Sequence, residues 1–425
     1  MTSIFQIWRY KDVRKRILIT VSLLIVFRLL SHIPLPGLSV QNLKDFFNQN
    51  AILGLLDLFS GGSIARFSLV MMGVGPYITA SIIMQLLTLV VPSLEILSKE
   101  GEYGYKKINQ YTRILTVPLA VFESYGLLLL LKNQQILPAS SLTPFVILLI
   151  LFASTAGTLL LMWLGEIISE SGIGNGISLI IAAGIVAGVP GNIAGIIATR
   201  INSSDIIKFI EMGILFIGAI AAVVVVNEGQ RNIPVEYAKR VRGRDTLGGV
   251  STHLPLRILT AGVIPIIFAI SLLTFPTVIA KFFEQARSPL IGSIAHFISR
   301  NLNPDGAIYA ILYFLFVMAF TYFYTAVVFN PIKVAENIQK QGGFIPGIRP
   351  GRQTAEYLSG VMNRVTIVGA IFLGLIAVLP FMIQRITGIG TVAIGGTGLL
   401  IIVSVAIETL KQFQSLILTR QYETY

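Results

Sequence analysis

Residue types that could support catalysis are scarce in this chain, and the best candidate is a glycine-rich run, GEIISESGIGNG, from Gly165 to Gly176. A glycine-rich turn that opens a helix can bind a phosphate group through its backbone amides. Such a site also needs a preceding strand or a Lys-Ser/Thr ending, and this run has neither. The run therefore predicts a tight turn between two helices, and no nucleotide site.

Other enzymatic chemistry is excluded by the residues that are missing. The chain has no cysteine and 3 histidines, with no HExxH motif and no Ser–His or paired-Asp arrangement within its apolar segments. Zinc proteases and intramembrane proteases need one of these arrangements. We expect a protein that is not an enzyme and that holds no cofactor and no metal.

Charged residues within apolar segments would indicate a transporter or a pump. The candidates here are Arg28, Glu123 and Glu408. Arg28 and Glu408 lie near predicted helix ends, where long side chains can snorkel or pair, and Glu123 is expected to face another helix. Because these residues form no relay of carboxylates, the sequence disfavours an ion-coupled carrier. A secondary transporter of small solutes is kept as the alternative to a channel.

The elements that must position these residues are membrane helices. The chain has 425 residues, 54% hydrophobic and 12% charged, with a mean hydropathy of +0.79. Soluble proteins carry about 25% charged residues, and a spanning helix needs about 20 apolar residues. We predict an all-α polytopic membrane protein with ten spans, at 17–36, 67–91, 114–131, 143–167, 176–198, 206–227, 256–280, 306–329, 365–384 and 391–418.

The distribution of Lys and Arg indicates the topology. These residues gather in the N-terminal tail and in loops 99–113, 231–257 and 333–364, all on one side of a ten-span arrangement. Because cytoplasmic loops are enriched in Lys and Arg, we predict that both termini are cytoplasmic. Loops 228–257 and 330–364 are longer than a helix connection requires, and their basic charge suits an acidic or RNA-containing partner.

One apolar segment is interrupted. Leu53–Phe59 is too short to span a membrane, and Ser60-Gly61-Gly62-Ser63 and Arg66 follow it before the apolar sequence resumes at Phe67. A short helix with such a break cannot face lipid, because its backbone groups would lack hydrogen-bond partners. The segment must be enclosed by protein or line a water-filled space, so the chain is predicted to enclose a cavity.

Aliphatic side chains stand beside glycine or proline residues in four of the predicted spans. They are Val74, Ile78, Ile177, Ile181, Ile267 and Ile401. Position and spacing alone assign such residues to a protein core or to a lipid-facing surface.

Long strings along nearly the whole chain resemble the SecY family, the channel subunits of the bacterial and plastid protein translocase. They include FRLLSHIPLPG (27–37), GPYITASIIMQLL (75–87), WLGEIISESGIGNGISLIIAAGIVAG (163–188) and YTAVVFNPIKVAENIQKQGGFIPGIRPGRQTAEYL (324–358). The resemblance implies two pseudo-symmetric inverted five-helix halves, residues 1–200 and 201–425, around a central pore. It implies a channel that translocates unfolded secretory polypeptides and releases transmembrane segments sideways into lipid.

The resemblance also assigns roles to residues. It implies that the six aliphatic residues form a hydrophobic pore ring, and that residues 53–66 form a plug beneath it. The implied plug residues are Leu55, Leu58, Phe59, Ser60, Gly61, Gly62, Ser63, Ile64 and Arg66. A lateral gate between the second and seventh spans would use Gln85, Asn175, Ser271 and Phe275. Gln85 and Asn175 are expected to hold the closed gate by hydrogen bonds.

The two long basic loops match those that bind the SecA motor or the translating ribosome. The implied residues are Arg231, Lys239, Arg240, Arg242, Arg244, Arg349 and Arg352. Further implied partners are small SecE and SecG subunits, signal sequences and lipid, in a bacterial inner membrane or a thylakoid membrane. Tyr105 and Arg352 replace a usual Arg and a usual acidic residue of the family, which leaves the strength of partner binding open.

Overall fold

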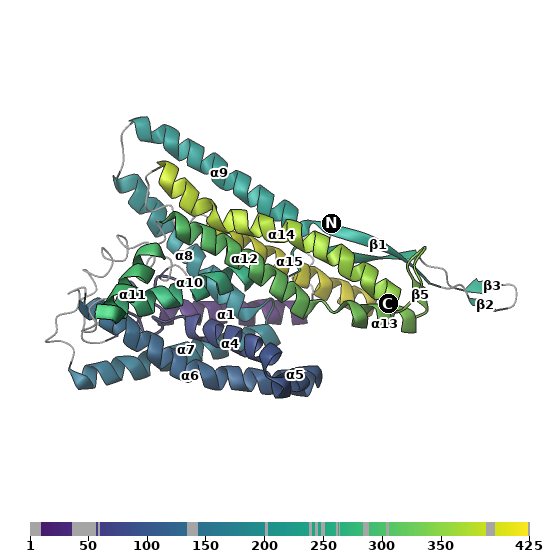
Figure 1. The fold of residues 1–425 in the computed structure, drawn as a ribbon, viewed down its shortest axis with the longest axis horizontal. Coiled ribbons are helices and arrows are strands. Elements are labelled where there is room, and N and C mark those ends of the chain that lie inside the picture. Colours follow the sequence, from purple (N-terminus) through teal and green to yellow (C-terminus); the bar gives the residue numbers. More distant parts are fainter. Residues whose placement is uncertain are drawn as a thin grey trace.

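The chain is mainly helical, and most helices run along the long axis of the molecule (Figure 1). The computed structural model describes residues 10–35, 57, 60–133, 143–199, 203–237, 240–242, 245–247, 251–260, 262, 264–283, 289–302, 306–387 and 396–423. Each of the ten segments predicted to span a membrane overlaps a described helix. These are α1 (Lys11–Leu30), α4 (Gly75–Val90), α6 (Glu102–Asn133), α7 (Pro144–Ser171), α8 (Gly176–Thr199), α9 (Ser203–Glu228), α10 (Ile264–Phe283), α12 (Ala307–Val328), α14 (Arg352–Thr387) and α15 (Gly396–Glu423).

A criterion of helix length and hydropathy, applied to the described helices, identifies fewer than the ten spans predicted from the sequence. Of the described helices, 5 are long and apolar enough to cross a membrane, or 6 if α4 and the bent helix α5 (Pro92–Lys99) are taken as one span. The angle between α4 and α5 is 101°. Proline at position 92 opens α5, and a proline is favoured at the start of a helix but not within one.

Two predicted helix starts are wrong. The second span was expected from residue 67, but residues 60–74 form turns and α4 begins at Gly75. Phe67 and Gly73 have φ of 48° and 58°, which no helix accommodates, and Pro76 stands in the first turn of α4. The seventh span was expected from residue 256, where the chain is still a β-strand.

A small antiparallel sheet projects from one end of the bundle (Figure 1). Its strand order is β4 (Ser251–Arg257), β1 (Gln230–Tyr237), β5 (Gly343–Phe344), and Ile233 lies opposite Leu254. Beyond it lies a short ribbon of β2 (Arg240–Arg242) and β3 (Asp245–Leu247). Ile233 and Val235 are buried against Leu358 of α14, so the sheet has a small core of its own.

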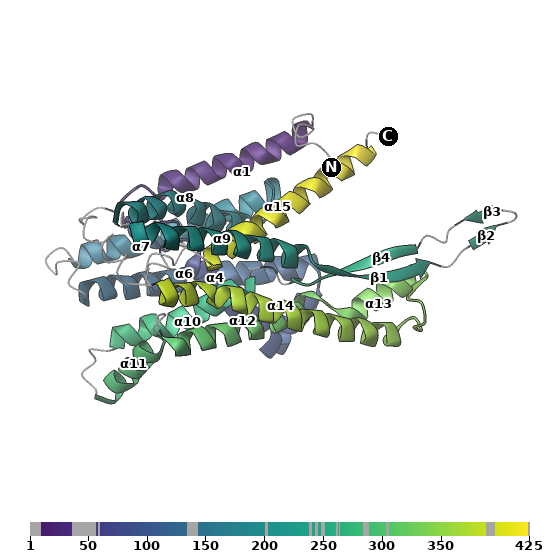
Figure 2. The ribbon, with the colours of Figure 1, turned by 90° about the horizontal axis from the view of Figure 1, so that it is seen from above.

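The chain enters and leaves the bundle at the same end. Figure 2 shows the start of α1 and the end of α15 on the side from which the sheet projects. Helix α13 (Pro331–Lys340) lies at this end too, and α11 (Pro289–Asn301) lies at the opposite end. The start of α13 follows local rules, because the Asn330 side chain accepts a hydrogen bond from the Lys333 amide at 3.1 Å.

Two apolar clusters fill the described part of the bundle. The larger one joins residues of α1, α4, α7, α8, α9, α10, α12, α14 and α15. The smaller one joins Ile64, Phe67 and Met71 to α6 and α7.

Candidate functional site: the aliphatic cluster and the Gly-Gly segment

The six predicted pore-ring residues all belong to the larger apolar cluster. Val74, Ile181, Ile267 and Ile401 are buried in it, and Ile78 and Ile177 are half-buried against it. They come from the start of α4 and from α8, α10 and α15, four elements far apart in the sequence. Their common cluster is compatible with a ring, and it also holds other core residues such as Ile168.

This group of side chains offers no functional group for chemistry. Aliphatic side chains neither bind an ion nor transfer a proton, and a narrow aliphatic collar resists ions because it is poorly wetted. Close helix packing positions it: a Cβ on Gly165 of α7 would clash with the Ile177 side chain, and one on Gly176 would clash with the Gly165 carbonyl oxygen. The glycines thereby let α7 approach the start of α8.

We call Asp57 together with residues 60–66 the Gly-Gly segment. The Asp57 side-chain carboxyl accepts a hydrogen bond from the Ala65 amide at 2.8 Å. The backbone carbonyl oxygen of Asp57 accepts one from Ser60 Oγ at 2.9 Å and one from the Gly62 amide at 2.8 Å. A single aspartate therefore closes the loop over eight residues. Leu55, Leu58 and Phe59 lie outside the described residues.

The surroundings of Asp57 act on its pKa in opposite directions. Burial raises the pKa of the Asp57 carboxyl above its usual value, while hydrogen bonds from the amides of Ala65 and Ile64 and the charge of Arg66 act in the opposite direction. The carboxyl accordingly titrates at a higher pH than a free aspartate.

The Gly-Gly segment meets the bundle at a seam of two glycines. A Cβ on Gly61 would lie 2.8 Å from Cα of Gly184 in α8 and 3.3 Å from the Phe27 ring. Gly61 also has a φ of 72°, a conformation that side chains disfavour. Arg28, in the last turn of α1, donates to the Gly61 carbonyl oxygen at 3.1 Å, so its side chain is held by the protein at this helix end.

The Gly-Gly segment contacts two different parts of the molecule. Ile64 belongs to the smaller cluster with α6 and α7, not to the cluster that holds the six aliphatic residues. At the start of α4, a Cβ on Gly73 would lie 3.4 Å from the Cβ of Ser60. The segment is therefore folded back onto the turn that carries Val74.

The hydrogen bonds expected of Gln85 and Asn175 across the gate are not found among the described residues. The Gln85 side-chain oxygen is buried and has no partner among the described residues. Asn175 caps its own helix, since its side-chain oxygen accepts from the Ser178 amide at 3.1 Å. Ser271 is half-buried on α10, and the backbone of Phe275 lies in the same helix. An amide at a helix start satisfies the free N–H groups there, which draws Asn175 away from α4.

The polar contact that does join α4 to a neighbour involves Glu123. Thr79 of α4 donates to the Glu123 carboxylate of α6 at 3.3 Å. This confirms that Glu123 faces another helix. Helix α10 packs against both α4 and α6, so the three helices meet.

The glycine-rich run forms the tight turn that its sequence predicts. Gly174 has a φ of 87°, and Ser169 accepts a hydrogen bond from the Gly176 amide at 2.9 Å. Arg16 of α1 donates to the Gly172 carbonyl oxygen at 3.2 Å. The run thus ties the α7–α8 turn to α1.

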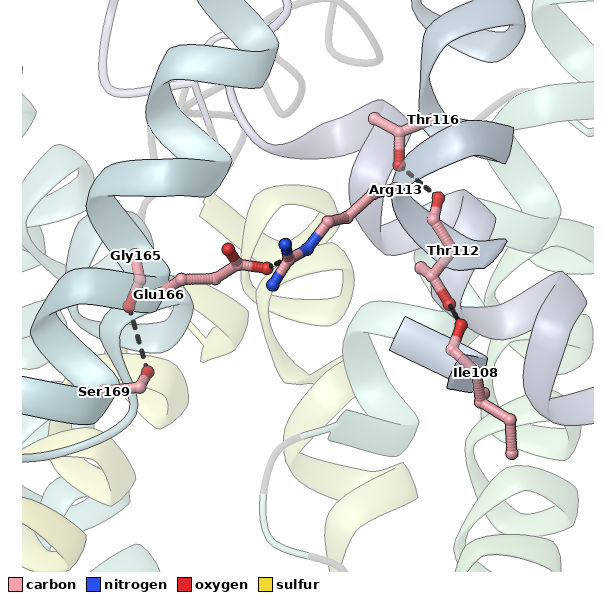
Figure 3. Close-up of polar contacts among 7 residues, drawn as sticks. All are labelled: Ile108, Thr112, Arg113, Thr116, Gly165, Glu166 and Ser169. Atoms are coloured by element: carbon pink, nitrogen blue, oxygen red, sulfur yellow. Dashed lines mark hydrogen bonds and ion pairs between the residues drawn. The ribbon is translucent and has the colours of Figure 1, made fainter. Parts of the chain in front are cut away.

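An ion pair that the sequence did not reveal joins α6 to α7 nearby. Figure 3 shows Arg113 and Glu166 reaching toward each other, with 2.8 Å between Arg113 Nε and Glu166 Oε1. No sequence spacing relates the two positions. Asp57, three residues before Ser60-Gly61-Gly62, was missed as well, although aspartate side chains commonly bond to backbone amides in turns.

The basic residues gather at the sheet end. Arg231 on β1, Arg349 and Arg352 are exposed, and Arg352 pairs with Glu356 at 3.0 Å. Arg349 makes no ion pair with a described residue, while Thr354 Oγ1 donates to its carbonyl oxygen at 2.9 Å and orders the turn. Arg240 and Arg242 lie in β2; Lys239 and Arg244 lie outside the described residues.

Solved structures share this fold. A protein-conducting channel matches with a TM-score of 0.62 and 18% identity, and a SecY protein studied for its plug domain matches with 0.65 and 21%. Canine Sec61 from a ribosome-channel complex matches with 0.61 and 19%. Each match covers 95% of this chain and 92% of the other, and at these identities it establishes the fold alone.

Sequence comparison establishes the family. The SecY family model matches residues 68–410. The SecY subunit of the protein translocase from Streptomyces galbus is 42% identical over 100% of this chain and 99% of its own, and that from Thermus thermophilus is 42% identical over 97% and 95%. This chain therefore belongs to the SecY family of protein translocase subunits, multi-pass membrane proteins that are not enzymes and that form a protein-conducting channel across a membrane.

Proposed function

We propose that the six aliphatic residues are the constriction through which an unfolded polypeptide passes. The observation that carries this proposal is their convergence in one cluster from α4, α8, α10 and α15. A collar without fixed hydrogen-bond partners can let any sequence slide through, and it limits ion flow because water wets it poorly.

In this proposal the Gly-Gly segment closes the channel at rest. Its support is the glycine seam with α8 and the contact with the turn that carries Val74. The plug domain of the related SecY protein stabilises the closed state of its channel, which favours the same role here. Opening would separate Gly61 from Gly184 and Ser60 from Gly73.

A lateral gate between α4 and α10 would release transmembrane segments into lipid. The support is that α4 and α10 come from opposite halves, 1–200 and 201–425, and pack against each other. The Thr79–Glu123 contact would steady the α4 side of this gate against α6, from within the first half of the chain.

The proposed membrane is a bacterial inner membrane or a thylakoid membrane, with both termini cytoplasmic. The positive-inside distribution of Lys and Arg supports this orientation. The sheet, α13, the start of α1 and the end of α15 would then lie on the cytoplasmic side.

At that side the channel would receive its driving force from SecA or a ribosome, since the sequence carries no nucleotide motif. Support comes from the exposed Arg231 and Arg349 and from the related canine channel, which occurs in a ribosome complex. SecE-type and SecG-type subunits and signal sequences complete the proposed partners.

A photo-crosslinking experiment tests the constriction. Benzoylphenylalanine replaces Ile181 or Ile401 in turn, and a secretory polypeptide is stalled in the reconstituted translocase. We expect both positions to crosslink to the stalled chain, and the same probe at the buried core residue Ile168 not to do so. Equal crosslinking at all three positions, or none at Ile181 and Ile401, would refute the assignment.

A charge-reversal pair tests the partner surface. Arg349→Glu is expected to abolish motor-driven transport, because its guanidinium is free for a partner. Arg352→Glu, whose native side chain is engaged with Glu356, should reduce transport much less. Equal transport by both variants in vesicles containing equal amounts of channel would contradict the role of Arg349.

A further inference from the structure

Helix α11 has no part in the channel account. It spans Pro289–Asn301, packs against α10, and lies at the end of the bundle opposite the sheet (Figures 1 and 2). Helix α11 overlaps none of the ten predicted spans.

Three sectors run along α11 at helical spacing. Small residues make up the first, in which Ala295 is buried and Gly292 and Ser299 are partly buried. This sector accounts for the packing of α11 on the protein.

The second sector is apolar and open. Leu290, Ile294 and Phe297 recur at i, i+4 and i+7, and they are 74%, 59% and 69% exposed. Large aliphatic and aromatic side chains on one open face of a helix indicate a surface that another phase or molecule covers.

The third sector is polar. Ser293, His296 and Arg300 are exposed and lie beside the apolar sector, not opposite it. A helix with an apolar face next to a polar face matches the boundary between hydrocarbon and water, where it can lie in the plane of the interface.

We propose that α11 is an interfacial helix, with Leu290, Ile294 and Phe297 inserted among lipid acyl chains on the side of the membrane opposite the sheet. The neighbouring surface favours lipid over a protein partner. Ile308 and Ile311, in the first turns of the membrane helix α12, are also exposed and apolar, and α12 begins six residues after α11 ends, so a surface suited to lipid follows α11 directly in the chain.

A consequence for the gate rests on the proposed function. Because α11 packs against α10, an α11 held in the interface would fix the depth of one end of α10 in the bilayer. The helix would then act as a lipid anchor for one side of the gate.

The absence of cysteine makes a direct test possible. Single variants Leu290→Cys, Ile294→Cys and Phe297→Cys carry nitroxide labels in the reconstituted translocase with its small subunits. Matched labels are placed at Ser293→Cys, His296→Cys and Arg300→Cys. Power saturation measures how accessible each label is to oxygen, which partitions into lipid, and to a water-soluble nickel chelate.

We expect the apolar-sector labels to be more accessible to oxygen than to nickel, and the polar-sector labels to show the reverse. Greater nickel accessibility in the apolar sector would place it in water and overturn the proposal. Exclusion of both reagents from the apolar sector would also overturn it, because a subunit or a second copy of the chain would then cover the helix.

A separate transport assay tests the link to α10. Phe297→Asp should impair transport, whereas His296→Asp, which puts the same charge into the adjacent polar sector, should not. Equal transport by the two variants would overturn the gate anchor. The lipid position of α11 is judged independently by the labels, and the constriction by the crosslinks at Ile181 and Ile401.

Discussion

The Gly-Gly segment and the aliphatic cluster are neighbours that are held in place by different forces. Hydrogen bonds to Asp57 and Arg28 and a close glycine contact hold the segment. The cluster is held by side-chain burial alone. Directional contacts are few and are lost together when a segment moves away, while aliphatic packing has no preferred partner. The Gly-Gly segment, which is proposed to move, is thus held by hydrogen bonds. The aliphatic cluster, which is proposed to give way to a polypeptide, is held by packing.

The largest effect is expected from a polar residue in the cluster. Ile401→Asn removes a fully buried side chain and buries an amide, at a cost of about 2–5 kcal/mol. If the cluster is the constriction, the amide also promotes wetting, so the resting channel should conduct ions in a planar bilayer.

Its matched control is Ile168→Asn, a buried position of the same cluster on α7 that is not one of the six. It should lower thermal stability in detergent to a similar extent and leave the conductance low. Similar conductance in the two variants would mean that the cluster is an ordinary core.

The second effect is expected at the glycine seam. Gly184→Ala places a methyl group against the Gly61 backbone, and overpacking of this kind costs about 1–3 kcal/mol. Hydrogen exchange at the amides of residues 60–66 should become faster because the segment seats less well. Gly218→Ala is the control, since a Cβ there meets nothing within 4 Å. Equally accelerated exchange in the control would show that the Gly61–Gly184 contact does not hold the segment.

A smaller effect is expected from the hydrogen bond between Arg28 of α1 and Gly61. Arg28→Gln shortens the donor to the Gly61 carbonyl oxygen, and losing one such hydrogen bond costs about 1 kcal/mol. The same exchange measurement should show a modest acceleration, and Arg14→Gln, an exposed position on α1, should show none. If both variants exchange like the native chain, Arg28 does not hold the segment.

The smallest effect concerns pH. Because the pKa of Asp57 is raised in the seated segment, the stability that its neutral form contributes is complete below the pKa of a free aspartate. This contribution is lost as the pH rises through the raised pKa. Exchange of residues 60–66, corrected for the intrinsic pH dependence, should therefore accelerate across that window. Asp57→Asn should remove the dependence; an unchanged profile in this variant would exclude Asp57 as its source.

The sequence predicts the membrane helices well because their signal is local. Twenty apolar residues identify a span whatever lies beside it, and the ten predicted segments all overlap helices. The errors arise where backbone conformation decides, as at Phe67 and Gly73, whose positive φ values delay the start of α4. The sheet left a weak signal in the alternation of Ile233 and Val235 with polar or proline neighbours, which the prediction of a long loop overlooked.

The site is less predictable, since its contacts join distant elements. The six aliphatic residues were found through family resemblance, because spacing alone favoured an ordinary core. Nothing in the sequence relates Gly61 to Gly184 or Arg113 to Glu166, which meet only in the folded bundle. The hydrogen bonds expected of Gln85 and Asn175 across the gate are not seen among the described residues, where a helix start takes up the Asn175 side-chain oxygen.

The central claim is that the Gly-Gly segment must leave the start of α4 before a polypeptide can pass. Ser60→Cys with Gly73→Cys tests it most directly, because the Cβ positions are 3.4 Å apart, just under the usual disulfide spacing of about 3.5–4.5 Å. Gly73 has a φ of 58°, so the Gly73→Cys single variant also measures the strain of a side chain at that position. Each single variant, treated identically, controls for the substitution itself. The account predicts that oxidation of the double variant stops transport and that reduction restores it. Equal transport by the oxidised and reduced double variant, with the disulfide verified by mass spectrometry, would contradict the claim.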